Sequence, residues 1–308
     1  MNLVNLSSEP EGKLYSWLPR DVQAEKVVFL PDACPGKSPL PTGTVLLTKQ
    51  EDWRKFALSD CGCGMRLIKS NISPSDLDQQ RWDELANRLK ANKGKLGDLG
   101  GGNHFLDALE PYDEDFVYFL IHTGSRHESG LVDDLVDKPA QFDREFERIV
   151  QWAEDNRAQI HKEVEAVFGE TELVLDLPHN TFEIQEDGGV IIRKGSVKLE
   201  SGQLAVIPSH MSGDVVLVRA TEKIKDVLNS MSHGTGRKMS RSECKPLADS
   251  FDFEQLRSQI MMPSWHDDAS LRTEGPFAYR DLDECLALIE GYVTEEKRFA
   301  VVGYMGHL

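Results

Sequence analysis

Three features of secreted, membrane-spanning or disulfide-stapled proteins are missing from this sequence. Its start, MNLVNLSSEPEGK, has no basic segment followed by an apolar one, as a secretory signal would. The longest strongly apolar run, FVYFLI, is far shorter than the roughly 20 residues needed to cross a bilayer. The five cysteines are odd in number and scattered, which indicates reduced thiols. We therefore expect a cytoplasmic protein with no membrane partner.

A basic excess is missing as well. The 308 residues include 52 Asp and Glu against 35 Lys and Arg, so the formal net charge is -17. This balance argues against a generic cationic nucleic-acid binder. Residues 191–245 depart from it, with ten Lys and Arg against five Asp and Glu. The segment is compatible with a confined basic groove, or with ordinary variation on a solvated surface.

Helical and strand patterns are mixed without regular alternation, which predicts an α+β fold and not a doubly wound sheet. Helices are expected over 73–94, 140–168 and 281–291. Short runs rich in Val, Ile and aromatic residues predict strands over 116–122, 172–177, 189–193, 204–207, 214–219 and 298–303. No internal repeat or flexible linker interrupts the chain, and several polar histidines lie at the ends of these strands.

Histidine is the most informative residue type for chemistry. His104, His122, His179 and His233 lie in Gly- or Asn-containing contexts, and a fifth element is the segment DCGCG at 60–64. A carboxylate, a thiolate and several imidazoles together suit a borderline transition metal. Taken singly each signal is weak, because a histidine at a strand end is more often a hydrogen-bonded structural residue. The C-x-C pair lacks the spacing of a zinc ribbon, and GDLGGG is not a phosphate-binding fingerprint.

Each of these segments alone is common, but their order along the chain is typical of one protein family. Taken together they resemble the motifs of the RtcB family of RNA ligases, over most of the chain. The matching segments are PDACPG (31–36), DCGCGM (60–65), LGGGNHF (99–105), HTGSR (122–126), LPHN (177–180), RKGSV (193–197), IPSHMSG (207–213), SHGTGRKMSR (232–241) and AYRDLDE (278–284).

The resemblance implies one catalytic domain over 1–308, with layered mixed β-sheets, surrounding helices and a central metal cleft. It also implies an RNA repair and tRNA-splicing ligase that uses GTP and two Mn²⁺ ions. Such an enzyme joins RNA ends carrying a 3′-phosphate or 2′,3′-cyclic phosphate to ends carrying a 5′-hydroxyl.

Site residues follow from the same resemblance, position by position. His233 is expected to accept GMP, and Cys63 is expected to bridge the two ions. The expected metal ligands are Asp60, Cys63, His104, His122 and His179. The expected nucleotide-pocket residues are Asn103, Asp107, Asn180, His210, Gly234, Thr235, Gly236, Arg237 and Tyr279. In this scheme Arg237 contacts phosphate oxygens, and RNA is held in a groove around His233.

Several positions depart from the family pattern. Cys34 stands where the family has His, and Asp107 replaces a Glu that reads the guanine base. His210 and Ser212 make the segment IPSHMSG differ from the family's IPGSMG. The last ten residues contain no Lys, although the family has a nucleotide-contacting Lys near its C-terminus. Two further hypotheses therefore stay open: a metal-dependent phosphoesterase that opens cyclic phosphates without joining ends, and a non-catalytic RNA-end binder. The sequence leaves the oligomeric state undetermined.

Overall fold

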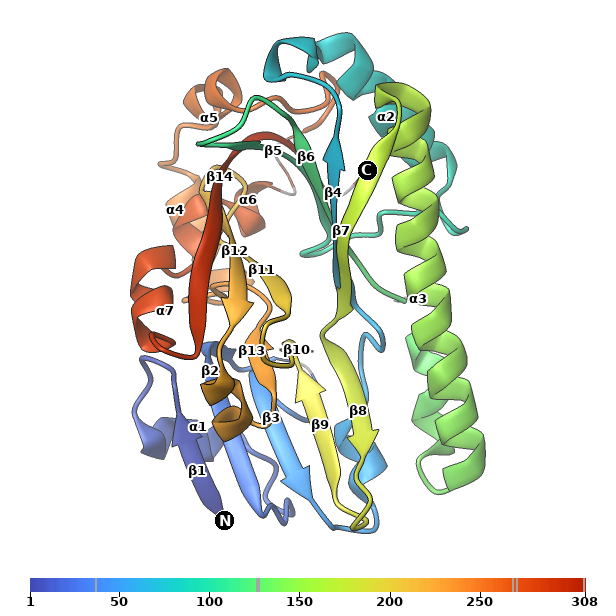
Figure 1. The fold of residues 1–308 in the computed structure, drawn as a ribbon, viewed down its shortest axis with the longest axis vertical. Coiled ribbons are helices and arrows are strands. Elements are labelled where there is room, and N and C mark those ends of the chain that lie inside the picture. Colours follow the sequence, from blue (N-terminus) through green and yellow to red (C-terminus); the bar gives the residue numbers. More distant parts are fainter. Residues whose placement is uncertain (37, 126–127, 268, 270, 307) are drawn as a thin grey trace.

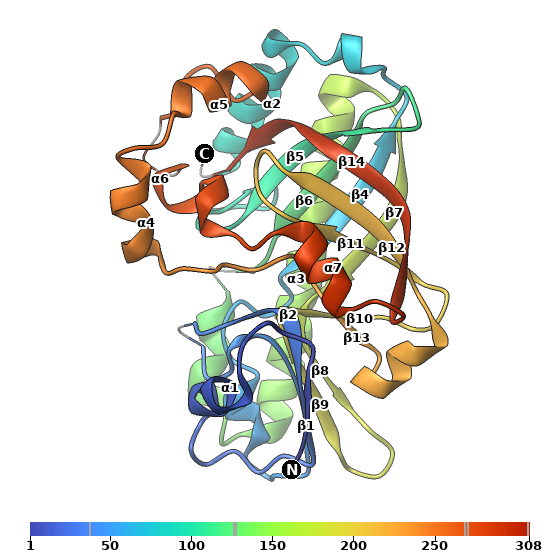
Figure 2. The ribbon, with the colours of Figure 1, turned by 90° about the vertical axis from the view of Figure 1, so that its left-hand side faces the viewer.

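A computed structural model describes residues 1–36, 38–125, 128–267, 269, 271–306 and 308. Two large sheets form separate layers of the molecule, with helices around them, so the predicted α+β class is confirmed. In Figure 1 the larger sheet occupies the upper half and the smaller sheet the lower half. The side view in Figure 2 shows the two sheets as an upper and a lower lobe, with α1 in the lower one.

The larger sheet has seven strands, and every pairing within it is antiparallel. Its order is β11 (Leu204–Pro208), β12 (Asp214–Ala220), β14 (Val293–Met305), β5 (Phe105–Pro111), β6 (Tyr118–Thr123), β4 (Gly64–Ser70) and β7 (Thr171–Pro178). The strands expected over 116–122, 172–177, 204–207 and 214–219 all lie here, and the one expected over 298–303 is the second half of β14. The sequence patterns did not predict β4 and β5.

The smaller sheet has five strands, of which only β1 and β2 pair in parallel. Its order is β1 (Asn2–Asn5), β2 (Lys26–Cys34), β3 (Thr42–Thr48), β9 (Val190–Lys194) and β8 (Asn180–Ile184). A separate antiparallel ribbon joins β10 (Ser196–Lys198) to β13 (Ser230–Ser232). Of these strands only β9 was predicted, over 189–193.

Each of the three predicted helices is present, with changed bounds. The expected helix over 73–94 is split into a 3₁₀ turn at Pro74–Asp76 and α2 at Gln79–Ala91, because Asp78 caps α2 by accepting from Arg81 N. The other two are α3 (Pro139–Phe168) and α7 (Leu282–Leu288). The remaining helices are α1 (Glu11–Trp17), α4 (Arg241–Ala248), α5 (Phe253–Gln259) and α6 (Leu271–Glu274), and further 3₁₀ turns cover Trp53–Phe56, Ser129–Leu135, Glu222–Val227 and Pro276–Ala278.

Helix α3 runs along both sheets (Figure 1). Its first half buries Phe142 and Ile149 in a cluster with Val190 and Ile192 of the smaller sheet. Its second half buries Val164 with Phe119 and Ile121 of the larger sheet, along with other side chains. The apolar stripe at helical spacing therefore joins the two sheets through one rigid element. Among the described residues, no helix is both long and apolar enough to cross a membrane.

Removing one large side chain from this stripe should weaken the whole fold. Phe142 is fully buried against Trp53 and Phe182. We expect Phe142→Ala to lower the free energy of unfolding by about 3–5 kcal/mol, through lost burial and the cavity left behind. Urea denaturation followed by circular dichroism measures this loss.

The control is Glu147→Ala on the exposed face of the same helix. It should change the free energy of unfolding by less than about 0.5 kcal/mol. Equal effects of the two substitutions would contradict the role assigned to this stripe.

Candidate active site

Four potential metal-binding side chains lie at one end of four neighbouring strands of the larger sheet. In the order β5-β6-β4-β7, His104 precedes β5, His122 lies near the end of β6, Cys63 precedes β4 and His179 follows β7. The register confirms that these ends coincide, since His122 pairs with Phe105 on one side and with Met65 on the other, and Gly64 pairs with Pro178. Alternating strand direction therefore brings together residues far apart in the sequence.

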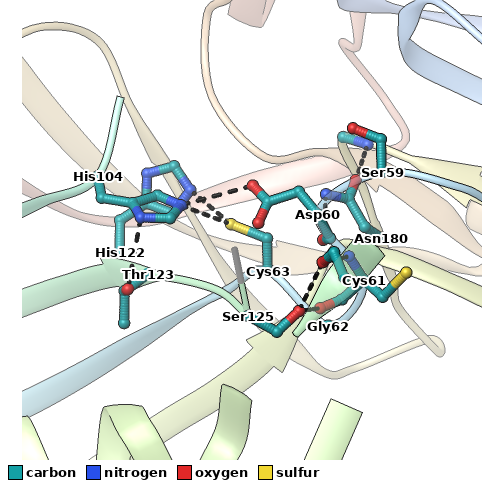
Figure 3. A network of polar contacts seen from close by, with 12 residues as sticks. Ser59, Asp60, Cys61, Gly62, Cys63, His104, His122, Thr123, Ser125 and Asn180 are labelled. Carbon is teal, nitrogen blue, oxygen red and sulfur yellow. Dashed lines mark hydrogen bonds and ion pairs between the residues drawn. The ribbon is translucent and has the colours of Figure 1, made fainter. Parts of the chain in front are cut away.

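The donor atoms of these side chains converge on the Cys63 thiol. Its Sγ lies 3.3 Å from Nε2 of His122 and 3.5 Å from Nε2 of His104. The Asp60 carboxylate lies 3.5 Å from the same His104 nitrogen. Figure 3 shows the two imidazoles and the carboxylate around the sulfur atom.

Two groups of possible ligands result, and Cys63 belongs to both. One contains Cys63, His122 and His179, the other Asp60, Cys63 and His104, with the donor atoms of each group within 4.8 Å of one another. Three buried polar atoms here, Asp60 Oδ1, His122 Nδ1 and His179 Nδ1, have no hydrogen-bond partner among the described residues. Because buried polar atoms are normally satisfied, this donor set of one carboxylate, one thiol and three imidazoles fits a metal centre.

Burial controls the protonation states in this cluster. It lowers the pKa of His122 and His179 well below the usual range, with help from neighbouring positive charges, so both imidazoles are neutral and able to bind a cation. It raises the pKa of the Cys63 thiol well above its usual range. Burial alone would also raise the pKa of Asp60, but the hydrogen bond from His104 and nearby positive charge, that of Lys194 included, together lower that pKa.

The turn that carries Asp60 and Cys63 is backbone-strained and held from several sides. Ser59 and Asp60 both have positive φ angles, 80° and 53°, which cost non-glycine residues free energy and occur preferentially at functional sites. Asn180 Nδ2 donates to the carbonyl of Asp60 over 2.9 Å, and Lys194 Nζ donates to that of Ser59 over 2.7 Å. A Cβ on Gly124 would lie 2.7 Å from Asp60 Oδ1, so the HTGSR segment packs directly on this turn. Arg126, the last residue of that segment, lies outside the described residues.

His233 lies beside the cluster and is oriented by a carboxylate. Its ring is 4.3 Å from that of His179 and 6.0 Å from that of His122, between centroids. Its Nδ1 lies 2.7 Å from Asp32 Oδ2 and 2.8 Å from the carbonyl oxygen of Gly195. Both partners are acceptors, so Nδ1 carries the proton, and in the neutral form of the ring Nε2 keeps a free lone pair. That is the form in which an imidazole can act as a nucleophile.

Two cavities share His233 in their walls. The first has a volume of about 230 Å³ and lies over the loops that follow β11 and β13. The second, of about 590 Å³, opens over Asp60, Cys63 and His179 and includes Lys194 and Arg241. His233 is therefore placed to react with a group bound in either cavity.

Most of the predicted nucleotide-binding residues lie around the first cavity. Eight of them line it: Asn103, Asp107, His210, Gly234, Thr235, Gly236, Arg237 and Tyr279. Asn180 lines the second cavity instead, where its side chain supports the Asp60 turn and accepts from Gly195 N. The structure thus brings the whole predicted set to the two cavities, while the role of each residue stays a prediction.

Two members of this set have contrasting surroundings. Asp107 is buried, its Oδ1 has no hydrogen-bond partner among the described residues, and burial raises the pKa of its carboxyl well above the usual range. Arg237 is instead engaged, because it donates to Glu274 over 2.7 Å and to the carbonyl of Thr273 over 2.8 Å. Asp107 is free to bind a ligand, whereas a phosphate contact by Arg237 would require these bonds to rearrange.

Most cations of the basic segment 191–245 are paired with acidic side chains. Among the described residues, six of the ten have an acidic partner within 4 Å: Arg193, Lys198, Arg219, Lys225, Arg237 and Arg241. Lys194 lines the second cavity, and Arg241 lines both cavities and keeps about half of its side chain exposed. These acidic partners offset much of the positive charge that the residue count suggested.

Three residues of the site were not identified from the sequence. Asp32 lies in the PDACPG segment, and Lys194 in RKGSV, so the matching motifs contained a signal for both. Glu274 lies in no motif, yet it accepts hydrogen bonds from Arg237, Arg241 and Tyr279 and fixes that wall of the first cavity.

Comparison with known proteins agrees with this geometry. The model of the RtcB family, described as tRNA-splicing ligase RtcB, matches residues 137–303. RNA-splicing ligase RtcB2 of Escherichia coli strain ATCC 25922 is 27% identical over an alignment of 323 positions that covers 86% of this chain and 83% of the relative. RNA-splicing ligase RtcB of Escherichia coli strain K12 is 28% identical over an alignment of 354 positions that covers 85% of each chain. The tRNA-splicing ligase RtcB of Nanoarchaeum equitans is 26% identical over an alignment of 297 positions that covers 73% of this chain and 62% of the relative.

Substitution of Gly236 tests whether close backbone packing holds Asp32 against His233. It has a φ of +71°, and a Cβ there would lie 2.6 Å from Cα and O of Asp32. Gly188 has a φ of +81° with nothing within 4 Å of its Cβ position, so it is a matched control for backbone strain alone. We expect Gly188→Ala to cost about 1–2 kcal/mol. Gly236→Ala should lower the free energy of unfolding by more, as measured by urea denaturation, and equal losses would contradict this packing.

Proposed function

The chain belongs to the RtcB family, and from this premise we propose that it is a GTP- and Mn²⁺-dependent RNA ligase. It joins an RNA end carrying a 3′-phosphate or 2′,3′-cyclic phosphate to an end carrying a 5′-hydroxyl, as in RNA repair and tRNA splicing. The observation that carries this proposal is the position of His233, with Nδ1 bound by Asp32 and its ring against a cluster of five metal-type donors.

Two Mn²⁺ ions fit the donor set as it stands. Asp60, Cys63 and His104 would hold one ion, and Cys63, His122 and His179 the other, since Cys63 belongs to both groups. When bound, such cations neutralise the charge of a triphosphate, which otherwise repels nucleophiles. Neutral His122 and His179 are ready to bind, whereas Cys63 releases a proton on binding.

His233 is proposed as the nucleophile. Its Nε2 attacks the α-phosphorus of GTP, a P–N bond forms, the bond to the oxygen bridging to the β-phosphate breaks, and pyrophosphate leaves. A 2′,3′-cyclic phosphate is first opened by water to a 3′-phosphate. An oxygen of the 3′-phosphate then takes the guanylyl group as the P–N bond breaks, which frees His233. Finally, the 5′-hydroxyl oxygen attacks the RNA phosphorus, loses its proton to solvent, displaces GMP and forms the phosphodiester. Asp32 acts throughout by holding the proton on Nδ1 and stabilising the charge that develops on the ring.

We assign GTP to the first cavity and the RNA ends to the second. Asp107 in the first cavity is buried without a hydrogen-bond partner among the described residues, which suits contact with the N–H groups of guanine. Lys194, which lines only the second cavity, and Arg241, which lines both, suit an RNA phosphate. The possible metal ligands and the residues that line the cavities come from both sheets and from segments between Asp32 and Tyr279. We therefore treat residues 1–308 as one catalytic domain.

The family membership favours ligation over the two other hypotheses. A metal-dependent phosphoesterase could also use an oriented histidine, as a general base that activates water, so only a covalent adduct at His233 separates ligation from that hypothesis. A non-catalytic binder would need neither the buried donors nor the pair formed by Asp32 and His233.

The nucleophile is tested by its covalent adduct. We expect wild-type protein incubated with Mn²⁺ and α-labelled GTP to retain label after denaturation, and His233→Ala to retain none. Asp32→Asn should slow labelling by about 10²- to 10⁴-fold, the range for a well-placed acid–base partner. Asp133→Asn is a matched control in the wall of the second cavity and should label like the wild type. Labelling of His233→Ala, or none of the wild type with GTP or ATP, would contradict the proposal.

The bridging position of Cys63 is tested by metal stoichiometry. We expect two Mn²⁺ per wild-type chain in isothermal titration calorimetry. His104→Ala and His179→Ala each remove a ligand of one group and should leave one ion bound, whereas Cys63→Ser should weaken both sites. Loss of a single site in Cys63→Ser would show that its sulfur binds only one ion.

A further inference from the structure

Helix α3 carries two consecutive polar side chains that are almost completely buried. Asn156 and Arg157 are each 1% exposed, between Ala153 and Ile160, which are apolar and fully buried. Arginine is almost never buried to this degree without specific partners. The position lies where α3 passes from the smaller sheet to the larger one, so apolar residues would serve packing alone equally well. The reason for burying the polar side chains of Asn156 and Arg157 therefore lies in the groups that they contact.

Arg157 contacts the backbone beside two of the metal-type donors. Its Nη1 donates to the carbonyl of Gly62 over 3.0 Å and to that of Thr123 over 3.2 Å. Gly62 immediately precedes Cys63, and Thr123 immediately follows His122. One nitrogen atom thus joins the strained turn that carries Asp60 and Cys63 to the end of β6. Figure 3 shows Gly62 and Thr123 on either side of Cys63 and His122.

The guanidinium group is itself held in place. Its Nε donates over 2.6 Å to Oδ1 of Asp176 in β7, and the other oxygen of that carboxylate accepts from Arg66 over 2.9 Å. A Cβ on Gly64 would lie 2.9 Å from the Arg157 Cζ atom, so the group is closely surrounded by protein. Because Arg157 is held by Asp176 of β7 and belongs to α3, it fixes the turn that carries Asp60 and Cys63 relative to both elements.

Asn156 makes the corresponding contacts to the loop that precedes His104. Its Oδ1 accepts from Gly97 N over 2.7 Å, and its Nδ2 donates to the carbonyl of Asp98 over 2.8 Å. The same Nδ2 lies 3.4 Å from Oγ1 of Thr123, a residue next to His122. The two neighbouring side chains on α3 therefore reach all three segments that supply Asp60, Cys63, His104 and His122.

We propose that Arg157 is a positioning residue of the metal centre, which fixes the separation of Cys63 and His122 through the carbonyls of Gly62 and Thr123. The proposal rests on the metal site of the proposed function and adds a residue that touches neither metal nor substrate. Groups that orient metal ligands in this way typically change metal affinity by about 10- to 100-fold when they are removed.

The experiment measures Co²⁺ binding by the full chain, from the thiolate-to-Co²⁺ absorption band that reports the Cys63 sulfur. Arg157→Met removes every donor, while Arg157→Lys keeps the charge but replaces the planar group that serves Asp176 and both carbonyls. The matched control is Arg54→Met. Arg54 also anchors α3, because it donates two hydrogen bonds of 2.8 and 2.7 Å to Asp143. Neither Arg54 nor Asp143 is next in sequence to a metal-type donor.

We expect Arg157→Met to bind Co²⁺ about 10- to 100-fold more weakly than the wild type, with an altered absorption band, and Arg157→Lys to lie between the two. Arg54→Met should lower the melting temperature while keeping the wild-type Co²⁺ affinity and spectrum. If Arg157→Met does not fold, Arg157→Lys decides by the same measurement. Wild-type Co²⁺ affinity and spectrum in the folded Arg157 variants would overturn the proposal. Absence of Co²⁺ binding by the wild type would instead overturn the metal centre, and this inference with it.

Discussion

Burying Cys63, His104, His122 and His179 together, beside the half-buried Asp60, is costly unless a cation satisfies their polar atoms. His104, His122 and His179 are each no more than 2% exposed, and polar atoms of the cluster lack hydrogen-bond partners among the described residues. This constraint accounts for much of the surrounding structure. Four strand ends must coincide, the turn at Asp60 adopts a left-handed backbone, and buried polar side chains of α3 bind the loops that carry the donors.

His233, the proposed nucleophile, lines both cavities of the site. His233 is oriented by Asp32 from the smaller sheet, while the donors against which it packs come from the larger sheet. In the proposed mechanism, nucleotide and RNA approach His233 from the two cavities that share it. Glu274 and other acids pair with most of the cations in 191–245. A net charge of -17 is then compatible with an RNA enzyme, since the proposed contact surface is small.

The sequence predicted features that depend on residues close together in the chain better than features that depend on residues far apart. The pattern of Phe142, Phe146 and Ile149 predicted α3 because a helical period is local, and the ordered motifs identified the donors that the sheet brings together. The first half of β14 was missed because its charged residues, Glu295 to Arg298, mask the strand pattern. Asp32 was missed as a partner of His233 because 201 residues separate them. Arg157 looks like an ordinary surface charge until its burial is known.

The most direct test of the central claim is ligation of a broken RNA stem-loop with defined ends. The account predicts a sealed product from a 3′-phosphate or 2′,3′-cyclic phosphate end and a 5′-hydroxyl end, which depends on Mn²⁺ and on GTP in preference to ATP. The predicted guanine contact of Asp107 is the reason for that preference. Release of a 3′-phosphate from the cyclic end without joining, and without any dependence on GTP, would contradict the account.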